Sequence, residues 1–424
     1  LGQPMDGWYG IQLDGSGCVS CIDMDGVPNC VIDHFLGGNN LIGNIPLEIG
    51  NLNDLTYLNL SFNQLNGPTP IEVGNLSSLS HLSLRYTQLS GSILSELGNL
   101  SNLSYLSLSN NQLSGSIPSE LGNLSNLSYL SLGGNQLSGS IPPELGNLIN
   151  LSHLTLDGNQ LSGSIPPELG NLSNLSYLYL RGTPLSGSIP SELGNLNNLL
   201  YLYLSNNQLS GSIPSELSNL SNLRALVLHS NQFTGNIPSE LGDLSNLSDL
   251  SLSSNQFAGN IPPELGNLSN LSYLQLNNNQ LSGSIPSELG NLSNLSYLRL
   301  DNNLLSGNIP LEIGSLSNLG SLYLNNNQLS GCYDANLMNL YDVGSNISVS
   351  NGNNFTASWE DFRYNGIGAC DNPYPNCRQS DSLALVALYN STNGANWTST
   401  WDLSQPMDTW YGVTLNGFGC VTEL

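Results

Sequence analysis

Aromatic side chains recur at one position every 24 residues along most of this 424-residue sequence. This aromatic column consists of Tyr57, His81, Tyr105, Tyr129, His153, Tyr177, Tyr201, Tyr273 and Tyr297, with Ala225, Asp249 and Ser321 at the same position in other repeats. Rings that carry a polar tip bury a large contact area while little side-chain entropy is lost, which suits the binding of peptides and glycans. We therefore predict a ligand-binding site at the densest group, which is Tyr177, Tyr179, Arg181, Tyr201, Tyr203 and His229.

The aromatic column also has a purely structural interpretation, in which the rings stack on one another and stiffen a sheet. The two interpretations differ in what they require of the sequence. A dedicated ligand groove should break the repeat pattern locally, whereas a structural column can remain uniform. The pattern is interrupted mainly within 223–252, by Arg224, Val227, His229, Asp243 and Asp249.

Residues suited to catalysis are scarce. The four histidines are His34, His81, His153 and His229, and three of them substitute into repeated surface columns. No HExxH, GxSxG, P-loop or dinucleotide-binding motif occurs. Twelve glutamates share one position of the repeat, from Glu48 to Glu312, and could collect Ca²⁺. Placement in the first turn of a helical segment explains each Glu locally, so we predict no enzyme, no metal and no cofactor.

The charge balance limits the possible partners. The chain has 6 Lys+Arg against 31 Asp+Glu, which gives a net charge of −25. An acidic surface repels phosphate backbones and anionic lipids, so nucleic acids are not expected to bind. No apolar run approaches the roughly 20 residues that span a bilayer, so we also expect no membrane insertion.

Cysteine usage indicates the compartment. Cys420 repeats Cys18 at an offset of 402 residues, so one period contains six of the seven cysteines: Cys18, Cys21, Cys30, Cys332, Cys370 and Cys377. Six cysteines allow 15 pairings. Paired cysteines predict an oxidising, extracellular setting, either secreted or at the cell surface; six buried free thiols are the alternative.

N-glycosylation sequons follow the 24-residue period and are frequently doubled, as in "GNLSNLS". The acceptor candidates are Asn99, Asn102, Asn123, Asn126, Asn171, Asn174, Asn267, Asn270, Asn291, Asn294, Asn354 and Asn396. The alternative is that the repeat pattern spells the sequon by coincidence.

These columns are positioned by a 24-residue unit that recurs from Leu55 to Leu319, with a degenerate copy at Val31, which makes 13 units. In "YLSLSNNQL", residues 105–113, alternation predicts a short strand with Leu106 and Leu108 inside and Tyr105, Ser107 and Ser109 in solvent. The Asn that recurs after this strand, as at Asn111 and Asn135, is expected to satisfy buried backbone groups. Pro118 is expected at the first position of a short helical or 3-10 segment.

One unit cannot fold alone. It buries about seven apolar side chains, which contributes roughly 10–20 kcal/mol, whereas ordering its backbone costs on the order of 24–48 kcal/mol. The template LxxLxLxxNxLSGxIPxELGNLxN resembles the plant-type leucine-rich repeat. This resemblance implies a repeat solenoid of the α/β class: a right-handed, curved superhelix with a parallel sheet on its concave face and short 3-10 or helical segments on its convex face.

The segments outside the repeats resemble the caps of such solenoids. Residues 1–22 and 403–424 agree at 13 of 22 positions, so we interpret both as parts of N-terminal caps. The predicted organisation is half of an N-terminal cap at 1–30, the solenoid at 31–331, a C-terminal cap at 332–377 and the N-terminal cap of a following module at 378–424. Within these caps we favour the pairs Cys21–Cys30, Cys332–Cys370 and Cys377–Cys420.

Three functions follow from this organisation. The first is an extracellular structural or adhesive module of a tandem or head-to-tail array that forms a filament, with copies of itself as partners. The second is a recognition module, similar to receptor ectodomains or polygalacturonase inhibitors, that binds a peptide or cell-wall polysaccharide on the concave face. The third is ice binding by the Ser and Asn columns.

Overall fold

The computed structural model describes residues 40–333 without a gap, together with 11–13, 19–23, 336–337, 340, 346–349, 351–355, 413–415 and 421–423. The chain forms two compact units, Leu1–Phe257 and Ala258–Leu424. Each unit is a stack of 24-residue coils. Each coil between residues 55 and 331 contributes one strand to a first sheet, one strand or bridge to a second sheet and one 3-10 helix. The predicted solenoid is therefore confirmed.

The first sheet is parallel and carries the aromatic column. In the first unit its strands are β2 (Val19–Asp23), β4 (Tyr57–Asn59), β6 (His81–Ser83), β8 (Tyr105–Ser107), β10 (Tyr129–Ser131), β12 (His153–Thr155), β14 (Tyr177–Tyr179), β16 (Tyr201–Tyr203), β18 (Ala225–Val227) and β20 (Asp249–Ser251). In the second unit they are β22 (Tyr273–Gln275), β24 (Tyr297–Arg299), β26 (Ser321–Tyr323) and β28 (Asn346–Ser348). Strands pair in register with the repeat, so that Tyr177 lies opposite Tyr201 and Tyr179 opposite Tyr203.

Two antiparallel hairpins occur in the segments predicted as N-terminal caps. The first joins β1 (Ile11–Leu13) to β2, and β2 continues in parallel to β4. The second joins β30 (Thr414–Leu415) to β31 (Val421–Glu423). In both hairpins the same repeat positions pair: Gln12 with Cys21 and Thr414 with Glu423, each followed by a register shift. The duplicated sequence therefore forms the same local structure twice.

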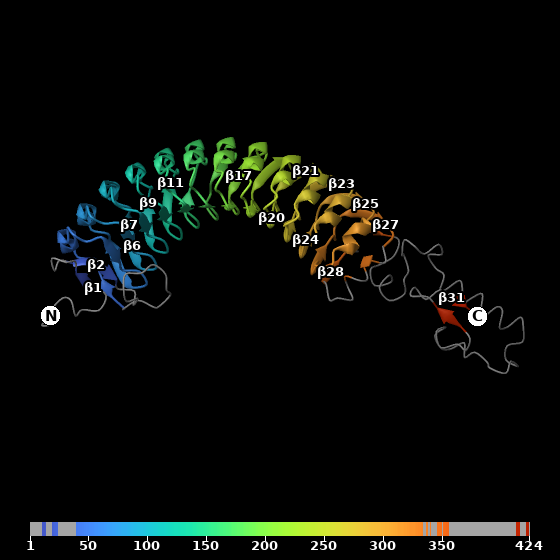
Figure 1. Cartoon of the computed structure of the whole chain (residues 1–424), viewed down its shortest axis with the longest axis horizontal. Helices are drawn as coiled ribbons and strands as arrows, with labels where there is room; N and C mark the ends of the chain where they lie inside the picture. The colour runs from blue at the N-terminus through green and yellow to red at the C-terminus, as the bar shows by residue number, and fades with distance from the viewer. Residues whose placement is uncertain are drawn as a thin grey trace, which may run out of the picture. The chain divides into compact units, whose positions relative to one another are not determined.

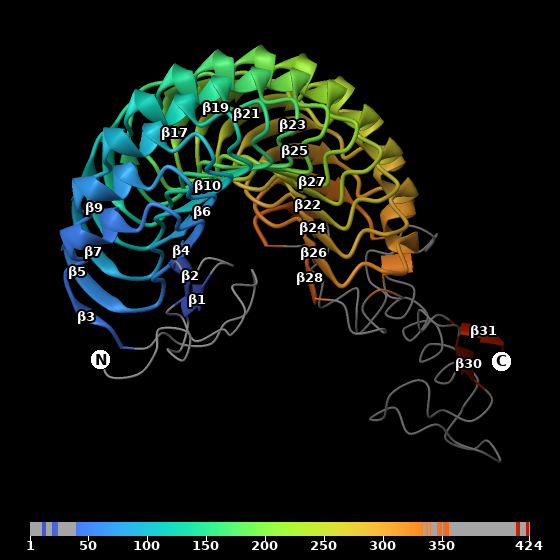
Figure 2. The same cartoon turned by 60° about the vertical axis from the view of Figure 1, so that its left-hand side comes forward.

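The second sheet runs along the flank of the coils, outside the first sheet (Figure 2). Its strands in the first unit are β3 (Ile42–Gly43), β5 (Gln64–Pro68), β7 (Gln88–Ser92), β9 (Gln112–Gly115), β11 (Gln136–Gly139), β13 (Gln160–Leu161), β15 (Ser186–Gly187), β17 (Gln208–Gly211) and β19 (Gln232–Gly235). At the boundary between the units is β21 (Gln256–Asn260), and the second unit contains β23 (Gln280–Gly283), β25 (Leu304–Gly307), β27 (Gln328–Gly331) and β29 (Asn354–Phe355).

The second sheet is interrupted between β13 and β15. In intact coils the residue before the flanking Leu donates its backbone N–H to the preceding coil, as Gln208 does to the carbonyl oxygen of Leu185 at 2.8 Å. Pro184 occupies this position in its own coil and has no N–H to donate. A single bridge between Gly163 and Leu185 remains there.

The helical segments are 3-10 helices of five residues. They are η2 (Leu47–Asn51), η3 (Ile71–Asn75), η4 (Ser95–Asn99), η5 (Ser119–Asn123), η6 (Pro143–Asn147), η7 (Pro167–Asn171), η8 (Ser191–Asn195), η9 (Ser215–Asn219) and η10 (Ser239–Asp243), followed in the second unit by η11 (Pro263–Asn267), η12 (Ser287–Asn291) and η13 (Leu311–Ser315). In each unit they lie on the outer side of a curved stack whose inner side is the first sheet (Figure 1).

The predicted position of Pro118 is wrong by one residue. Pro118 is the N-cap of η5, with extended backbone angles of φ −66° and ψ 135°, and the helix begins at Ser119. Proline stands inside the first turn only where a second proline follows, as at Pro143 after Pro142. The proline ring fixes φ but does not require a helical ψ. Proline can therefore occupy the extended residue before a 3-10 helix as well as the first helical position.

The core is a column of aliphatic side chains through the middle of each stack. In the coil that begins at Leu103, all seven apolar side chains predicted as core are at most 3% exposed: Leu103, Leu106, Leu108, Leu113, Ile117, Leu121 and Leu124. The predicted exposure of Ser107 and Ser109 is wrong, because they are 1% and 7% exposed. Ser107 lies on the same face as Tyr105 and Ser109, and its Oγ is 3.4 Å from Oγ of Ser109.

The recurring asparagine ties neighbouring coils together, as predicted. In Asn135 the amide Nδ2 donates to the carbonyl oxygens of Leu108 and Leu132, both at 3.0 Å. Its Oδ1 accepts the backbone N–H of Leu113 at 3.1 Å. One side chain therefore satisfies backbone groups in two successive coils.

The turn after each first-sheet strand has one residue with positive φ. In most coils it is Asn, Gly or Ser, but Phe62 and Tyr86 adopt φ of 57° and 53°. Bulky side chains rarely enter this region. The two rings stack with centroids 4.8 Å apart, and the guanidinium carbon of Arg85 lies 5.1 Å from the Phe62 centroid. These contacts offset part of the backbone strain.

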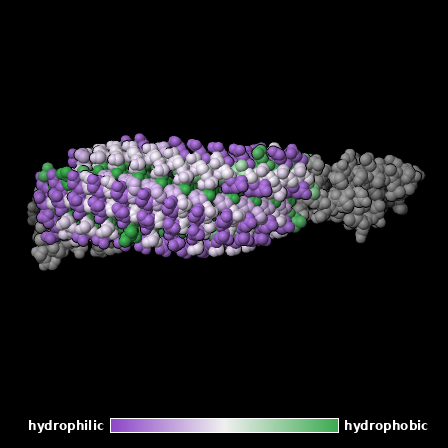
Figure 3. Space-filling view, turned by 90° about the horizontal axis from the view of Figure 1, so that it is seen from above, coloured by the Kyte–Doolittle hydropathy of each residue, from purple (hydrophilic) through white to green (hydrophobic). Residues whose placement is uncertain are grey.

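The outer face is mainly hydrophilic, with small isolated apolar patches (Figure 3). Within the described ranges no helix is long and apolar enough to cross a membrane.

Candidate functional site

The aromatic column forms a continuous stack along the first sheet of the first unit. From Tyr57 to Tyr201, successive ring centroids lie 4.1–5.4 Å apart. All pairs are nearly parallel except Tyr129 and His153, whose planes differ by 37°. The geometry therefore matches the structural interpretation of the column: most ring faces cover one another, and burial raises the pKa of Tyr105.

A second pair of rings widens this stack at β14 and β16. Tyr179 and Tyr203 stack with centroids 4.8 Å apart. Each stands edge-on to the first-column ring of its own strand, Tyr177 or Tyr201, at 6.1 Å. Strand alternation explains the arrangement, because residues two apart point to the same face. Four tyrosines from two adjacent strands thus form one block on the concave face.

Arg181 extends this block toward the turn. Its guanidinium carbon lies 5.4 Å from the Tyr179 centroid and 5.1 Å from the Tyr203 centroid, which is cation–π range. Its Nη2 is 2.7 Å and its Nε 2.8 Å from Oδ2 of Asp157. The Arg181 side chain is nevertheless 46% exposed, against 18% for Asp157. The site therefore presents an oriented, accessible cation beside two rings.

Burial sets the protonation behaviour of the block. It raises the pKa of Tyr179 to about 12, with a smaller contribution from Tyr203. Burial also raises the pKa of Asp157, although the hydrogen bonds and charge of Arg181 act in the opposite direction. At neutral pH Tyr179 is therefore a neutral hydrogen-bonding group.

His229 lies apart from the other predicted site residues. It occupies the same repeat position as Arg181, two coils further on, with the buried Ser205 at that position between them. Its Nδ1 is 3.2 Å from Oγ of Ser230. Burial lowers its pKa, and Arg181 lowers it further. The structure thus brings Tyr177, Tyr179, Arg181, Tyr201 and Tyr203 into one patch and leaves His229 at its margin.

Sequence analysis missed Asp157 as part of the site. A usable signal was present: Asp157 precedes Arg181 by 24 residues, so the two side chains occupy the same position in adjacent coils. Opposite charges at that spacing predict an ion pair across the sheet. Asp249 was identified only as a departure from the pattern, although it lies on the same face, on β20.

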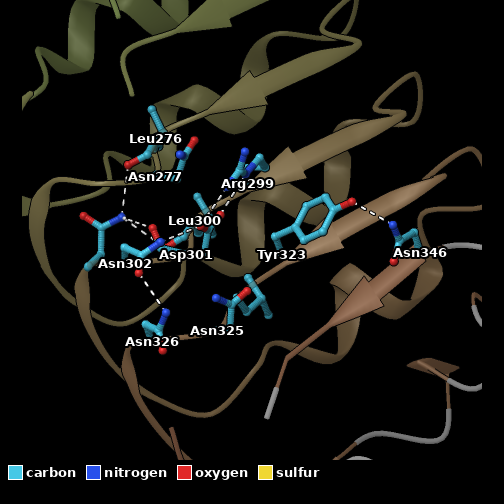
Figure 4. Close-up of polar contacts among 12 residues, drawn as sticks. Leu276, Asn277, Arg299, Leu300, Asp301, Asn302, Tyr323, Asn325, Asn326 and Asn346 are labelled. Atoms are coloured by element: carbon cyan, nitrogen blue, oxygen red, sulfur yellow. Dashed lines mark hydrogen bonds and ion pairs between the residues drawn. The ribbon is translucent and has the colours of Figure 1, made fainter. Parts of the chain in front are cut away.

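A second arginine cluster, in the second unit, is more enclosed (Figure 4). Arg299 binds Asp301 through two hydrogen bonds of 2.9 Å, and the Asp301 side chain is 3% exposed. Hydrogen bonding to Asp301 raises the pKa of Arg299. Asn302 also donates to Asp301, at 2.7 Å, and Arg299 lies 5.3 Å from the Tyr323 centroid. These mutual contacts suit a structural network better than a ligand site.

The predicted acceptor asparagines that the structure describes are all exposed, whereas the sequon asparagine Asn59 is buried. In four doubled sequons the second Asn donates its Nδ2 to a carbonyl oxygen 25 residues earlier at 2.8–2.9 Å; these are Asn102, Asn126, Asn174 and Asn294. Asn396 lies outside the described residues. Cys332 is disulfide-bonded. Of the other predicted disulfide residues, Cys21 is described only as part of β2, and Cys30, Cys370, Cys377 and Cys420 lie outside the described residues.

Two family models match the chain. The model "Leucine-rich repeat region" matches residues 165–282. The model "Leucine Rich Repeat" matches residues 54–76, 78–100, 102–124, 126–148, 150–172 and 294–316. No curated protein matches the sequence.

Solved structures of plant receptors are similar to the chain. The plant peptide hormone receptor RGFR1 in complex with RGF2 is 35% identical over 75% of this chain, with a TM-score of 0.64. The ectodomain of the Arabidopsis thaliana membrane receptor kinase GASSHO1/SCHENGEN3, in complex with CASPARIAN STRIP INTEGRITY FACTOR 2, is 37% identical over 79%, with a TM-score of 0.63. The chain covers 58% and 46% of these two structures, respectively.

A bacterial structure is similar over most of its length. A leucine-rich repeat protein of Leptospira interrogans is 32% identical over 75% of this chain and 86% of that chain, with a TM-score of 0.58.

Proposed function

Because the chain belongs to the leucine-rich repeat family, we propose that it is a recognition module that binds an extended peptide along the concave face of its first unit. The proposed contacts are Tyr177, Tyr179, Arg181, Tyr201 and Tyr203. The observation that carries the proposal is the exposed Arg181 held across two stacked tyrosines. The proposal assigns the chain no reaction.

A peptide suits this geometry better than a polysaccharide does. Sugar rings bind aromatic side chains mainly through the ring face, and both faces of Tyr177 are covered, by His153 and Tyr201. What the block offers instead is ring edges, hydroxyl groups and a guanidinium, which suit backbone carbonyls and side chains. The two similar plant receptors are also in complex with a peptide hormone and a protein factor, respectively.

The test measures binding of the full chain to an array of extended dodecapeptides, with cell-wall oligosaccharides on the same array. The double variant Tyr179→Ala/Tyr203→Ala should weaken the best peptides by about 30-fold, because central aromatic residues carry much of an interface's free energy. Tyr273→Ala is the matched control, since Tyr273 occupies the aromatic column in the second unit and is 48% exposed. Equal affinities for the double variant and the parent would contradict the proposal, as would binding of oligosaccharides alone.

The proposed setting is extracellular and oxidising, as the disulfide at Cys332 indicates. Copies of the protein expressed through a eukaryotic secretory pathway should carry N-glycans at the exposed sequon asparagines. Peptide mapping after enzymatic deglycosylation measures the occupancy of each site. If the asparagines of all sequons are unmodified, the sequons are explained by the repeat pattern alone and glycosylation is refuted.

The repeated hairpin supports a second candidate function, a structural or adhesive array that forms a filament. In the first hairpin β2 leads into the solenoid strand β4, and the second hairpin repeats its register. We propose that the second copy starts another solenoid, so that modules follow with a period of 402 residues. Electron microscopy of native material should show filaments with one module per period. Isolated single solenoids would refute the array and leave the peptide site unaffected.

A further inference from the structure

Asp249 presents an uncompensated carboxylate on the concave face beside the proposed peptide site. It is the first residue of β20 and lies in register with Ala225 of β18. Its Oδ1 is buried and has no hydrogen-bond partner. Two residues further along the same face, Ser251 is 3% exposed and its Oγ also lacks a partner. Two adjacent polar groups therefore remain unsatisfied at one place.

No cation of the described chain neutralises this carboxylate. The whole chain has only 6 Lys+Arg. Arg181 is paired with Asp157. The exposed Arg224 of the neighbouring coil contacts Asp249 through its backbone, since its carbonyl oxygen accepts the N–H of Asp249 at 3.1 Å. Among the described residues the ion pairs are Arg181–Asp157 and Arg299–Asp301, and neither includes Asp249. A desolvated, unpaired charge is unfavourable unless something compensates it, and burial accordingly raises the pKa of this carboxyl.

The concave face beside Asp249 lacks the large rings of the preceding coil. In the first unit the aromatic column ends at Tyr201, and the next coil has Ala225 and Val227 where the preceding coil has Tyr201 and Tyr203. The charge of Asp249 contributes to raising the pKa of Tyr203, so the two groups are within electrostatic reach across β18. Ala225 is itself 3% exposed, so a ligand side chain would lie on the surface between the tyrosines and the half-buried Asp249 and not in a hollow.

From this arrangement we propose that Asp249, with Tyr201 and Tyr203, binds a guanidinium or ammonium group of the peptide ligand. Rings and a carboxylate together suit a cation, because the ring face attracts it and the carboxylate pairs with it. The inference rests on the proposed peptide function and specifies the residue type that the site selects.

The experiment compares peptides that differ in one charge. Dodecapeptides that bind the full chain are remade with citrulline in place of each Arg, because citrulline keeps the shape and removes the charge. With the parent protein we expect one Arg position at which citrulline weakens binding by about 30-fold or more. With Asp249→Asn that difference should fall to about threefold or less. Asp243→Asn is the matched control, since it removes the same charge from the exposed end of η10.

The outcomes separate this inference from the proposed function. If no peptide binds the parent, or if binding is indifferent to Tyr179→Ala/Tyr203→Ala, the proposed function itself fails. If peptides bind through those tyrosines but Asp249→Asn discriminates Arg from citrulline as the parent does, only the cation subsite is overturned. Equal effects of Asp243→Asn and Asp249→Asn would also overturn it, because they would show a long-range charge effect.

Discussion

Replacing Asn135 by alanine tests whether the asparagine column, and not leucine packing alone, holds neighbouring coils together. The substitution removes three donor hydrogen bonds, to the carbonyl oxygens of Leu108, Leu132 and Gly133, and one acceptor, for the N–H of Leu113. The asparagine itself is 8% exposed, so water cannot readily replace these bonds.

The structure shows that these four losses are unequal, and the bond to Gly133, at 3.3 Å, is the longest. The carbonyl oxygen of Leu108 also accepts from Asn111 at 3.1 Å, and that of Leu132 from Asn159 at 3.1 Å. Both carbonyls therefore keep a donor, and the main penalty is the N–H of Leu113, which loses its side-chain acceptor. A buried N–H without a partner costs about 1–3 kcal/mol, and the lost donor bonds bring the total to about 2–4 kcal/mol.

Native-state hydrogen exchange at the Leu113 amide is the appropriate assay, because solenoids need not unfold in a single step. A loss of about 2–4 kcal/mol corresponds to about 30- to 700-fold faster exchange at 1.4 kcal/mol per tenfold. Asn135→Thr should accelerate exchange almost as much, because Thr183 shows that threonine keeps only a donor bond, there to the carbonyl oxygen of Leu180 at 3.2 Å, and the Leu113 N–H would still lose its acceptor. Exchange less than threefold faster in the alanine variant would refute the reasoning, as would a threonine variant that exchanges like the parent.

Three further predictions concern stability measured by urea unfolding. Tyr86→Asn should change the free energy of unfolding by less than about 1 kcal/mol, because relief of the positive φ offsets the lost stacking on Phe62; a loss near 3 kcal/mol would contradict this. Asp249→Asn should stabilise the protein at pH 7, because burial raises the folded-state pKa of the carboxyl above its unfolded value, which disfavours the charged form. The gain should shrink as the pH falls from the raised folded-state pKa toward about 4, and should be lost at lower pH, where the carboxyl is protonated in both states. A gain that is independent of pH would be evidence against it. Leu130→Ala should lower the free energy of unfolding by about 2–5 kcal/mol, since Leu130 is 0% exposed. Leu304→Ala should lower it by less than about 0.5 kcal/mol, because Leu304 is 48% exposed. Similar losses at both positions would show that burial is not the cause.

The coil, its core and its asparagine column could be predicted from the sequence because they depend on spacing alone. Leu106 and Asn135 are fixed by their place in a 24-residue period, and each has the same neighbours as its counterparts in adjacent coils. The sequence did not predict that Ser107 is buried. Alternation tells which face a side chain occupies, but not how far larger neighbours such as Tyr105 cover that face.

The candidate site could be predicted only in part. Tyr179, Arg181 and Tyr203 were identified because the aromatic residues are densest in these two adjacent coils. The unpaired state of Asp249 was not predictable, because it depends on which groups fail to reach the carboxylate. Burial and missing hydrogen bonds belong to the three-dimensional packing and leave no signal in residue spacing.

The proline that interrupts the second sheet also affects the mechanics of the molecule. At Pro184 the flank loses a backbone bond between the coils of β12 and β14, so under tension or bending this joint is more compliant than its neighbours. The joint lies in the second sheet of the coil that carries Tyr179 and Arg181, whereas Tyr179 belongs to the first sheet. A ligand that contacts β12, β14 and β16 would therefore connect the coils on both sides of this joint, and its binding would stiffen the stack where it bends most easily.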